Sequence, residues 1–378
     1  MFDALPAEMA EATRLTRAGR LADATALIQR LLQGAKPGAV DPGASRTIDL
    51  VPLSVEFADP QPGPARWTHA AAGATLRETL RGLAGRGAGK RGAAPLPEGA
   101  SFHTHSLTTD AGTRAYKLYI TGCRADGPRP LVVMLHGCTQ SPDDFAAGTR
   151  MNVLAEEHGC FIAYPEQPHS ANCSKCWNWF SPEHQQRGAG EPSLIAGITR
   201  EIIRNHPVDA SRVYIAGLSA GGAAAAIMGA IYQDLYAAVG VHSGLPHGAA
   251  RDLPSAFATM RQGGVPSYVH GAGMVPTIVF HGDQDTTVHP RNGEAVAAQS
   301  QARGGERTKM ERGQVPGGHA YTRALHEDSS GRVVCEHWTI HGAGHAWAGG
   351  APAATYTDPR GPDASREMLR FFLQQSRR

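Results

Sequence analysis

Residues 214–224, YIAGLSAGGAA, place Ser219 at the centre of a G-x-S-x-G pattern, between Gly217 and Gly221. A strand that turns sharply into a helix strains the residue at the turn, and only very small neighbours fit two positions away. The run before the serine (212–216) is apolar and partly β-branched, and the alanine-rich run after it (220–232) is a good helix former. The pattern therefore predicts a strand, a tight turn and a helix, with the hydroxyl of Ser219 exposed at the turn.

A serine hydroxyl is a poor nucleophile near neutral pH, so it needs a histidine as general base and a carboxylate that orients the histidine. In a fold with this turn, the acid and the histidine follow the serine in the chain. The strand-like run 277–280 is followed by HGDQDTTV, which contains Asp283 and Asp285. We expect Asp285 to be the acid and Asp283 to be its rival; the alternative is a loop aspartate that caps the next helix.

The histidine is expected near the end of the chain. The strand-like run 336–340 is followed by HGAGHAWAGG, which contains His341 and His345. Glycines on both sides of His345 suit a loop that brings an imidazole to Ser219, whereas His341 lies nearer the strand. We expect His345 to be the base, with an ordinary loop histidine as the alternative.

Short apolar runs separated by helical segments fill the chain from about residue 101. They are RAYKLYI, LVVMLHG, CFIAYPE, RVYIAG, AAVGVHS, TIVFHG and VVCEHWTIHG. Near-continuous apolar strands that alternate with helices indicate an α/β fold with a mostly parallel twisted sheet covered by helices on both faces. The run at 114–120 alternates polar and apolar residues, which suits an antiparallel edge strand. In such folds the working groups lie at the carboxyl ends of the strands.

Composition divides the chain into three parts. Residues 1–34 have the pattern of an amphipathic helix, which could pack on the main domain or bind a partner. Residues 35–100 are dominated by glycine, proline and alanine and predict a mostly flexible linker. Residues 101–378 form the predicted catalytic domain.

Charge and hydropathy argue against a nucleic-acid partner and a membrane span. A formal net charge of +2 gives no basic field for nucleic acid, and no apolar run approaches the roughly 18 to 20 residues that a membrane span needs. The first residues, MFDALPAEMAEATRLTRAGRL, are charged throughout and lack the hydrophobic core of a signal peptide. The sequence does not address the oligomeric state.

Acyl transfer also needs hydrogen-bond donors for the negative charge that develops on the carbonyl oxygen. One donor is expected to be the backbone N–H of Ala220. The other is expected from the loop after the strand 131–135, where Gly137 lets the chain turn and Cys138 or Thr139 presents its N–H. A nucleophilic role for the Cys138 thiol is the weaker alternative.

The six cysteines are Cys123, Cys138, Cys160, Cys173, Cys176 and Cys335. Cys173 and Cys176 have the C-x-x-C spacing of redox motifs, but WNWF follows them instead of a helix start. A zinc site would need a second pair of ligands at suitable spacing, which is not evident. The residues leave open a disulfide, possibly to Cys138, or plain buried thiols.

Five stretches together resemble the esterase family of extracellular polyhydroxybutyrate (PHB) depolymerases, whose relatives include feruloyl and acetyl xylan esterases. They are VVMLHGCTQSPDDFA, NCSKCWNWF, GLSAGGAAA, HGDQDTTV and GAGHAWAGG, and the resemblance spans roughly residues 114–372. It implies an α/β-hydrolase fold and a catalytic triad of Ser219, Asp285 and His345. It also implies hydrolysis of esters, often oligomers or polymers of 3-hydroxyalkanoates, without a metal or organic cofactor. The resemblance favours a disulfide in the cysteine-rich tract and an extracellular location.

The N-terminal 100 residues depart from that family, because they show neither a signal peptide nor a β-rich polymer-binding module. Soluble oligomers or small esters are therefore the expected substrates rather than crystalline polymer. A feruloyl or acetyl xylan esterase is the alternative within the hydrolases. A binding protein that kept the fold without the chemistry, and a thiol oxidoreductase, are the alternatives from other classes.

Three tryptophans lie near the predicted site in the sequence and could bind an aliphatic or aromatic acyl group. Trp347 is favoured for this role because it lies two residues from His345. For Trp177 and Trp179, substrate binding and ordinary core packing are equally good interpretations.

Overall fold

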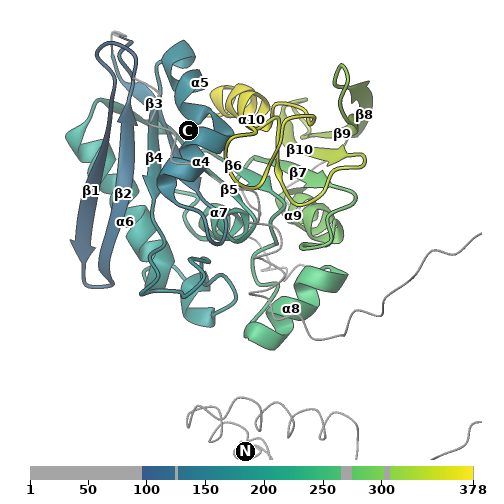
Figure 1. Ribbon diagram of the computed structural model, residues 1–378, viewed down its shortest axis with the longest axis horizontal. Coiled ribbons are helices and arrows are strands. Elements are labelled where there is room, and N and C mark those ends of the chain that lie inside the picture. Colours follow the sequence, from purple (N-terminus) through teal and green to yellow (C-terminus); the bar gives the residue numbers. More distant parts are fainter. Residues whose placement is uncertain (1–95, 124–126, 265–274, 302–306, 378) are drawn as a thin grey trace, which may run out of the picture. The chain divides into compact units, whose positions relative to one another are not determined.

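The structure is a computed structural model that describes residues 96–123, 127–264, 275–301 and 307–377 (Figure 1). The helix predicted for residues 1–34 and the predicted linker as far as residue 95 lie outside this part of the chain. The division into three parts therefore stays a prediction.

The described residues form a ten-stranded sheet in the order β1-β2-β4-β3-β5-β6-β7-β10-β9-β8 (Figure 1). The six strands from β4 to β10 in this order run parallel, and the two strands at each end run antiparallel. Their bounds are β1 Ser101–Thr109, β2 Gly112–Ile120, β3 Arg129–Leu135, β4 Phe161–Pro165, β5 Val208–Leu218, β6 Ala238–His242, β7 Thr277–Gly282, β8 Arg307–Gln314, β9 Ala320–Glu327 and β10 Val333–Ile340. A small parallel pair consists of β11 Trp347–Ala348 and β12 Thr357–Asp358.

The predicted α/β fold is confirmed, with one correction at the sheet edge. The strand predicted at 114–120 is antiparallel as expected, but it lies between β1 and β4 and is not an edge strand. The edge is β1, which pairs with β2 along its whole length.

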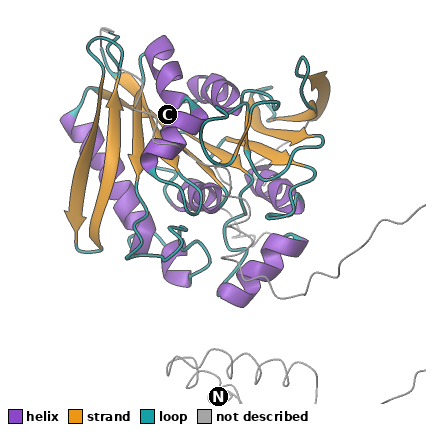
Figure 2. Cartoon of the chain, in the orientation of Figure 1, coloured by secondary structure: helices purple, strands orange, loops and turns teal. Residues whose placement is uncertain are grey.

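Helices cover both faces of the sheet (Figure 2). The core on one face includes residues of α6, α7, α8 and α9, and the core on the other face includes residues of α4, α5 and α10. The bounds are α4 Pro142–Thr149, α5 Met151–His158, α6 Gly190–Asn205, α7 Ala220–Ile231, α8 Leu253–Gln262, α9 Arg291–Gln301 and α10 Ala364–Leu373, with a 3₁₀ turn, η1, at Pro182–Gln185.

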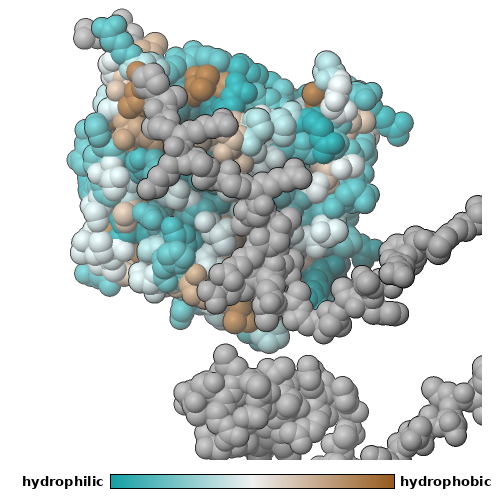
Figure 3. All heavy atoms as spheres, viewed as in Figure 1, coloured by the Kyte–Doolittle hydropathy of each residue, from teal (hydrophilic) through white to brown (hydrophobic). Residues whose placement is uncertain are grey.

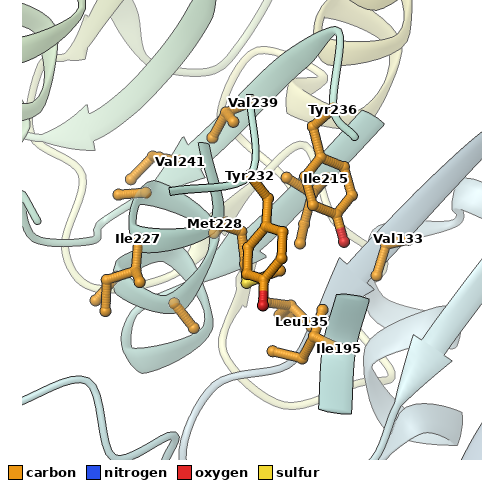
Figure 4. Close-up of a cluster of buried hydrophobic side chains, with 14 of the residues drawn as sticks. Val133, Leu135, Ile195, Ile215, Ile227, Met228, Tyr232, Tyr236, Val239 and Val241 are labelled. Carbon is orange, nitrogen blue, oxygen red and sulfur yellow. The ribbon is translucent and has the colours of Figure 1, made fainter. Parts of the chain in front are cut away.

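Strand β3 shows why this sequence forms a sheet that is buried on both sides. Leu131, Val133 and Leu135 belong to the core that includes α7, and part of this core is drawn in Figure 4. Val132 and Met134 alternate with them and belong to the core on the opposite face. Each buried large apolar side chain contributes about 1.5–3 kcal/mol relative to exposure, so both faces stabilise the sheet.

On the face of the molecule shown in Figure 3, hydrophobic residues are scattered among hydrophilic ones. Isolated apolar side chains are normal on a protein surface. Among the helices that the structure describes, none has the length and apolar character needed to cross a bilayer.

The topology fixes where the predicted site residues meet. Ser219 follows β5, Asp285 follows β7, and His345 follows β10. These strands lie in the consecutive parallel series β5-β6-β7-β10, so their carboxyl ends share one edge of the sheet.

Candidate active site

Ser219 occupies the sharp turn between β5 and α7 with φ 58° and ψ −119°, a conformation that a residue with a side chain rarely adopts. The turn is held because the Ser219 amide donates to the His242 carbonyl at 2.9 Å. A Cβ atom added at Gly217 would lie 2.3 Å from the Gly221 carbonyl, and one added at Gly221 would lie 2.1 Å from the Leu135 oxygen. The two glycines are therefore a steric requirement of the turn that presents the serine.

Asp285 and His345 form a hydrogen-bonded pair, in which the histidine Nδ1 donates to the aspartate Oδ2 at 2.7 Å. The other carboxylate oxygen accepts the amides of Thr287 and Val288 at 2.9 and 2.8 Å. Asp285 is buried and the His345 side chain is 9% exposed. Because Nδ1 carries the proton, Nε2 of His345 is left as the basic nitrogen.

The rival residues pair with each other instead. His341 Nδ1 donates to Asp283 Oδ2 at 2.9 Å, and the Gly342 amide donates to the other Asp283 oxygen. The second nitrogen of His341 lies 2.8 Å from the Thr322 hydroxyl. This pair is much more exposed than the first, since the side chains of His341 and Asp283 are 43% and 32% accessible.

Electrostatics keep Asp285 ionised. Burial alone would raise the pKa of its carboxyl, but the positive charge of protonated His345 and the hydrogen bonds from His281 and His345 outweigh burial and lower the pKa. His281 Nε2 donates to the Val288 carbonyl at 2.8 Å and lies 3.4 Å from Asp285 Oδ2. An ionised acid is what an imidazolium at position 345 needs as its partner.

Ser219 and His345 line the same cavity, which has a volume of about 380 Å³. Its apolar lining residues are Trp179, Phe180, Leu218, Leu245, Leu253, Ala256, Phe257, Met260 and Val288. Its polar side chains include Asn172, Ser174, Asn178, Thr287 and Tyr356. Within the described residues, the lining contains no lysine, arginine, aspartate or glutamate.

Two of the predicted oxyanion donors, Ala220 and Cys138, line this cavity, and Thr139 does not. Ala220 is the first residue of α7, so its amide has no acceptor within the helix. Cys138 and Thr139 are the two alternatives for the second donor. The Thr139 amide already donates a hydrogen bond to the Ser174 carbonyl at 2.7 Å. The Cys138 amide makes no hydrogen bond to another described residue, and Cys138 lines the cavity. The structure therefore favours Cys138 over Thr139.

A disulfide joins Cys138 to Cys176 and fastens the cysteine-rich tract to the loop after β3. Both cysteines line the cavity, as does the free and exposed Cys173. The bridge answers the question that the cysteine spacing left open, and it excludes a disulfide between Cys173 and Cys176 in this structure.

We predict that replacing both Cys138 and Cys176 with serine destabilises the protein by about 2–4 kcal/mol, because the bridge closes a 38-residue separation in the unfolded chain. Denaturant unfolding without reductant should show a lower midpoint. Cys123→Ser is the matched control, since Cys123 is free and exposed. A double variant as stable as the control would contradict the prediction.

The tryptophans correct the expectation for substrate binding. Trp347 is buried and does not line the cavity, because its ring packs between Phe145 and His242 and its Nε1 donates to Ser365. Trp177 is likewise buried, and its Nε1 donates to the His136 carbonyl. Of these three tryptophans, Trp179 is the one that lines the cavity.

Two histidines at this edge of the sheet were not predicted as site residues from the sequence. His281 lies at the end of β7 beside Asp285, and His242 is the last residue of β6. Both occupy the carboxyl ends of parallel strands, so the general rule for such sheets would have identified them as candidates.

Comparisons with known proteins identify the family of the chain. The sequence profile of the family described as Esterase PHB depolymerase matches residues 114–306, which is half of the 378-residue chain. The chain is 32% identical over 254 residues to poly(3-hydroxyalkanoate) depolymerase C of Paucimonas lemoignei, a match that covers 63% of this chain and 59% of that protein. It is 30% identical over 264 residues to feruloyl esterase B of Neurospora crassa, covering 64% of this chain and 82% of that protein.

The fold comparison points the same way. The acetyl xylan esterase from Aspergillus awamori superimposes with a TM-score of 0.56 at 22% identity, covering 72% of this chain and 99% of that one. This likeness supports the α/β-hydrolase fold, and the profile match and sequence relatives identify the family. The chain therefore belongs to the esterase family of PHB depolymerases.

Proposed function

We propose that the chain is a serine esterase that hydrolyses carboxylic esters through an acyl-enzyme. The observation that carries the proposal is the Asp285–His345 hydrogen bond at 2.7 Å, with His345 and the strained Ser219 on one cavity. Family membership supports the same reaction class.

In the proposed mechanism, His345 removes the proton of Ser219 while the hydroxyl oxygen attacks the ester carbonyl. The amides of Ala220 and Cys138 stabilise the resulting oxyanion. Collapse of the tetrahedral intermediate expels the alcohol, which takes the proton from His345, and leaves an acyl group on Ser219. Water activated by His345 then releases the acid, while Asp285 holds the imidazole in the needed tautomer.

The cavity suggests the acyl group. Its wall is largely apolar, and within the described residues no lysine, arginine, aspartate or glutamate lines it. A neutral aliphatic acyl chain would be desolvated at little cost there, whereas a carboxylate would lose its hydration without an ionic partner. Oligomers of 3-hydroxyalkanoates fit this chemistry, and one relative is named for depolymerising such polyesters.

A second candidate, a feruloyl or acetyl xylan esterase, is favoured by specific observations. Trp179, Phe180 and Phe257 on the cavity wall could stack on an aromatic acid, and the match to feruloyl esterase B covers 82% of that protein. The depolymerase match covers a smaller share of its relative, 59%.

A matched pair of chromogenic esters tests the acyl-group proposal. p-Nitrophenyl butyrate and mono-p-nitrophenyl succinate both have four-carbon acyl chains, but the succinate carries a terminal carboxylate. We expect kcat/KM for the butyrate to be higher by about 100-fold or more, because the cavity offers the carboxylate no ionic partner. Equal rates would contradict the proposed lining.

The second arm of the experiment compares hydroxybutyrate trimers, methyl ferulate and acetylated xylo-oligosaccharides by product release. The trimer should give the highest kcat/KM, by about tenfold or more. Rates measured with Ser219→Ala are subtracted as the part of the turnover that does not depend on the serine. A preference for ferulate or acetyl xylan would replace the first candidate by the second.

A further inference from the structure

His242 contacts two segments of the candidate site at once. Its backbone carbonyl accepts the Ser219 amide at 2.9 Å. Its side-chain Nε2 accepts the Ala348 amide at 3.0 Å, and this hydrogen bond is buried. Ala348 lies three residues after His345, so one residue bonds both to the turn that carries the serine and to the segment that follows the histidine.

The ring of His242 is held in a fixed orientation. Phe280 stacks at 5.8 Å with an interplanar angle of 11°, and Trp347 stacks at 5.1 Å with an angle of 25°. The side chain is fully buried. Aromatic neighbours of this kind restrict rotation of the imidazole, so the direction of its Nε2 is set by packing.

The protonation state suits an acceptor. Burial, together with the neighbouring charges of His281 and His345, lowers the pKa of His242 to about 3, against an opposing contribution from Asp285. A neutral imidazole that accepts through Nε2 carries its proton on Nδ1, and that nitrogen lies 3.2 Å from the Ser243 hydroxyl. The imidazole of His242 is therefore neutral, with Nδ1 as a donor and Nε2 as the acceptor of the Ala348 amide.

We propose that His242 is a positioning residue that fixes the separation between the nucleophile turn and the segment carrying the catalytic histidine. The inference rests on the proposed serine-esterase mechanism, because it assigns no step to His242 itself. His242 does not line the cavity, so it acts on the alignment of Ser219 and His345 and not on substrate binding. Trp347 has a role in the same arrangement, because its ring packs against the imidazole of His242.

The expected loss of turnover depends on how far Ser219 and His345 move out of alignment when the acceptor at position 242 is lost. Without an acceptor at position 242, the Ala348 amide would be buried and unpaired, and the segment would shift to find another partner. A displacement of about 1 Å between reacting groups can lower turnover about 100-fold.

Two substitutions separate the acceptor from the ring. His242→Phe keeps an aromatic ring between Phe280 and Trp347 but removes the acceptor, and we expect kcat to fall about 100-fold with KM little changed. His242→Gln restores an acceptor at a similar reach, and we expect kcat within about tenfold of the wild type. Rates are expressed per active site titrated with a fluorophosphonate, so that loss of folded protein does not count as loss of turnover.

His337→Phe is the matched control. His337 is another histidine with a buried ring nitrogen, on β10, and its Nε2 has no hydrogen-bond partner among the described residues. This variant should keep the wild-type kcat. The proposal is overturned if His242→Phe turns over like the control, or if His242→Gln is as impaired as His242→Phe.

A measurement on the unmodified protein covers the case in which the Phe variant does not fold. Two-bond ¹H–¹⁵N correlations of the imidazole should show His242 as the neutral Nδ1–H tautomer. An Nε2–H tautomer or an imidazolium would overturn the proposal, because neither can accept the Ala348 amide. Failure of the underlying mechanism has a different signature, since wild-type protein would then not be labelled at Ser219 by the fluorophosphonate.

Discussion

Ser219→Ala is expected to lower ester turnover by about three or more orders of magnitude and to leave the fold intact. The variant removes the only atom that can form the acyl bond in the proposed mechanism, so the two-step route is lost. The variant should still accelerate the reaction somewhat over the rate in water alone, because substrate binding and the amides of Ala220 and Cys138 remain.

The substitution should have little effect on stability. Alanine meets the same backbone strain at φ 58° as serine, and the amide of residue 219 still donates to the His242 carbonyl. Thermal unfolding should therefore agree within a few degrees between variant and wild type.

Ser193→Ala is the matched control for this experiment. Ser193 lies in α6, where its hydroxyl donates to the Gly190 carbonyl, and it does not line the cavity. It should retain wild-type turnover and fluorophosphonate labelling, whereas Ser219→Ala should lose both. Wild-type turnover in Ser219→Ala would remove the nucleophile assignment.

The features that were predictable from the sequence are those fixed by backbone geometry. The glycines around Ser219 are required by close approaches of 2.1 to 2.3 Å, so their spacing predicts the turn. The apolar runs of β3 to β7 are buried on both faces, so they are continuous and easily recognised.

The strands that were missed lie where one or both faces meet solvent. β8 has the sequence RTKMERGQ and mostly exposed side chains, so no apolar run marks it. β1 (SFHTHSLTT) is similar. Such strands are held by pairing with β9 and β2, which is tertiary context that a local pattern does not contain.

The sequence also did not show in which direction each side chain near the site points. Trp347 is two residues from His345 in the chain but packs into the core, and Trp179 reaches the cavity from a distant segment. The sequence favoured Asp285 and His345 but left Asp283 and His341 as rivals, because each loop contains two candidates and the local pattern does not show which side chains meet. The structure pairs Asp285 with His345 and Asp283 with His341.

These two carboxylate–histidine pairs allow a controlled test of the acid. Asp285→Asn is expected to lower kcat by about four orders of magnitude at neutral pH. The asparagine amide can donate to Nδ1 of His345, which would favour the tautomer that carries its proton on Nε2 and cannot accept the proton of Ser219. The variant also removes the negative charge that stabilises the imidazolium.

Asp283→Asn changes the same residue type two positions away and breaks a similar hydrogen bond, between His341 Nδ1 and the carboxylate at 2.9 Å. Neither Asp283 nor His341 lines the cavity, so kcat should stay within a few-fold of the wild type. Steady-state kinetics on p-nitrophenyl butyrate, with thermal unfolding as a check on folding, compare the two variants directly. The assignment fails if both variants lose the same activity, because the loss would then reflect the loop that both acids share, and it is reversed if Asp283→Asn alone is inactive.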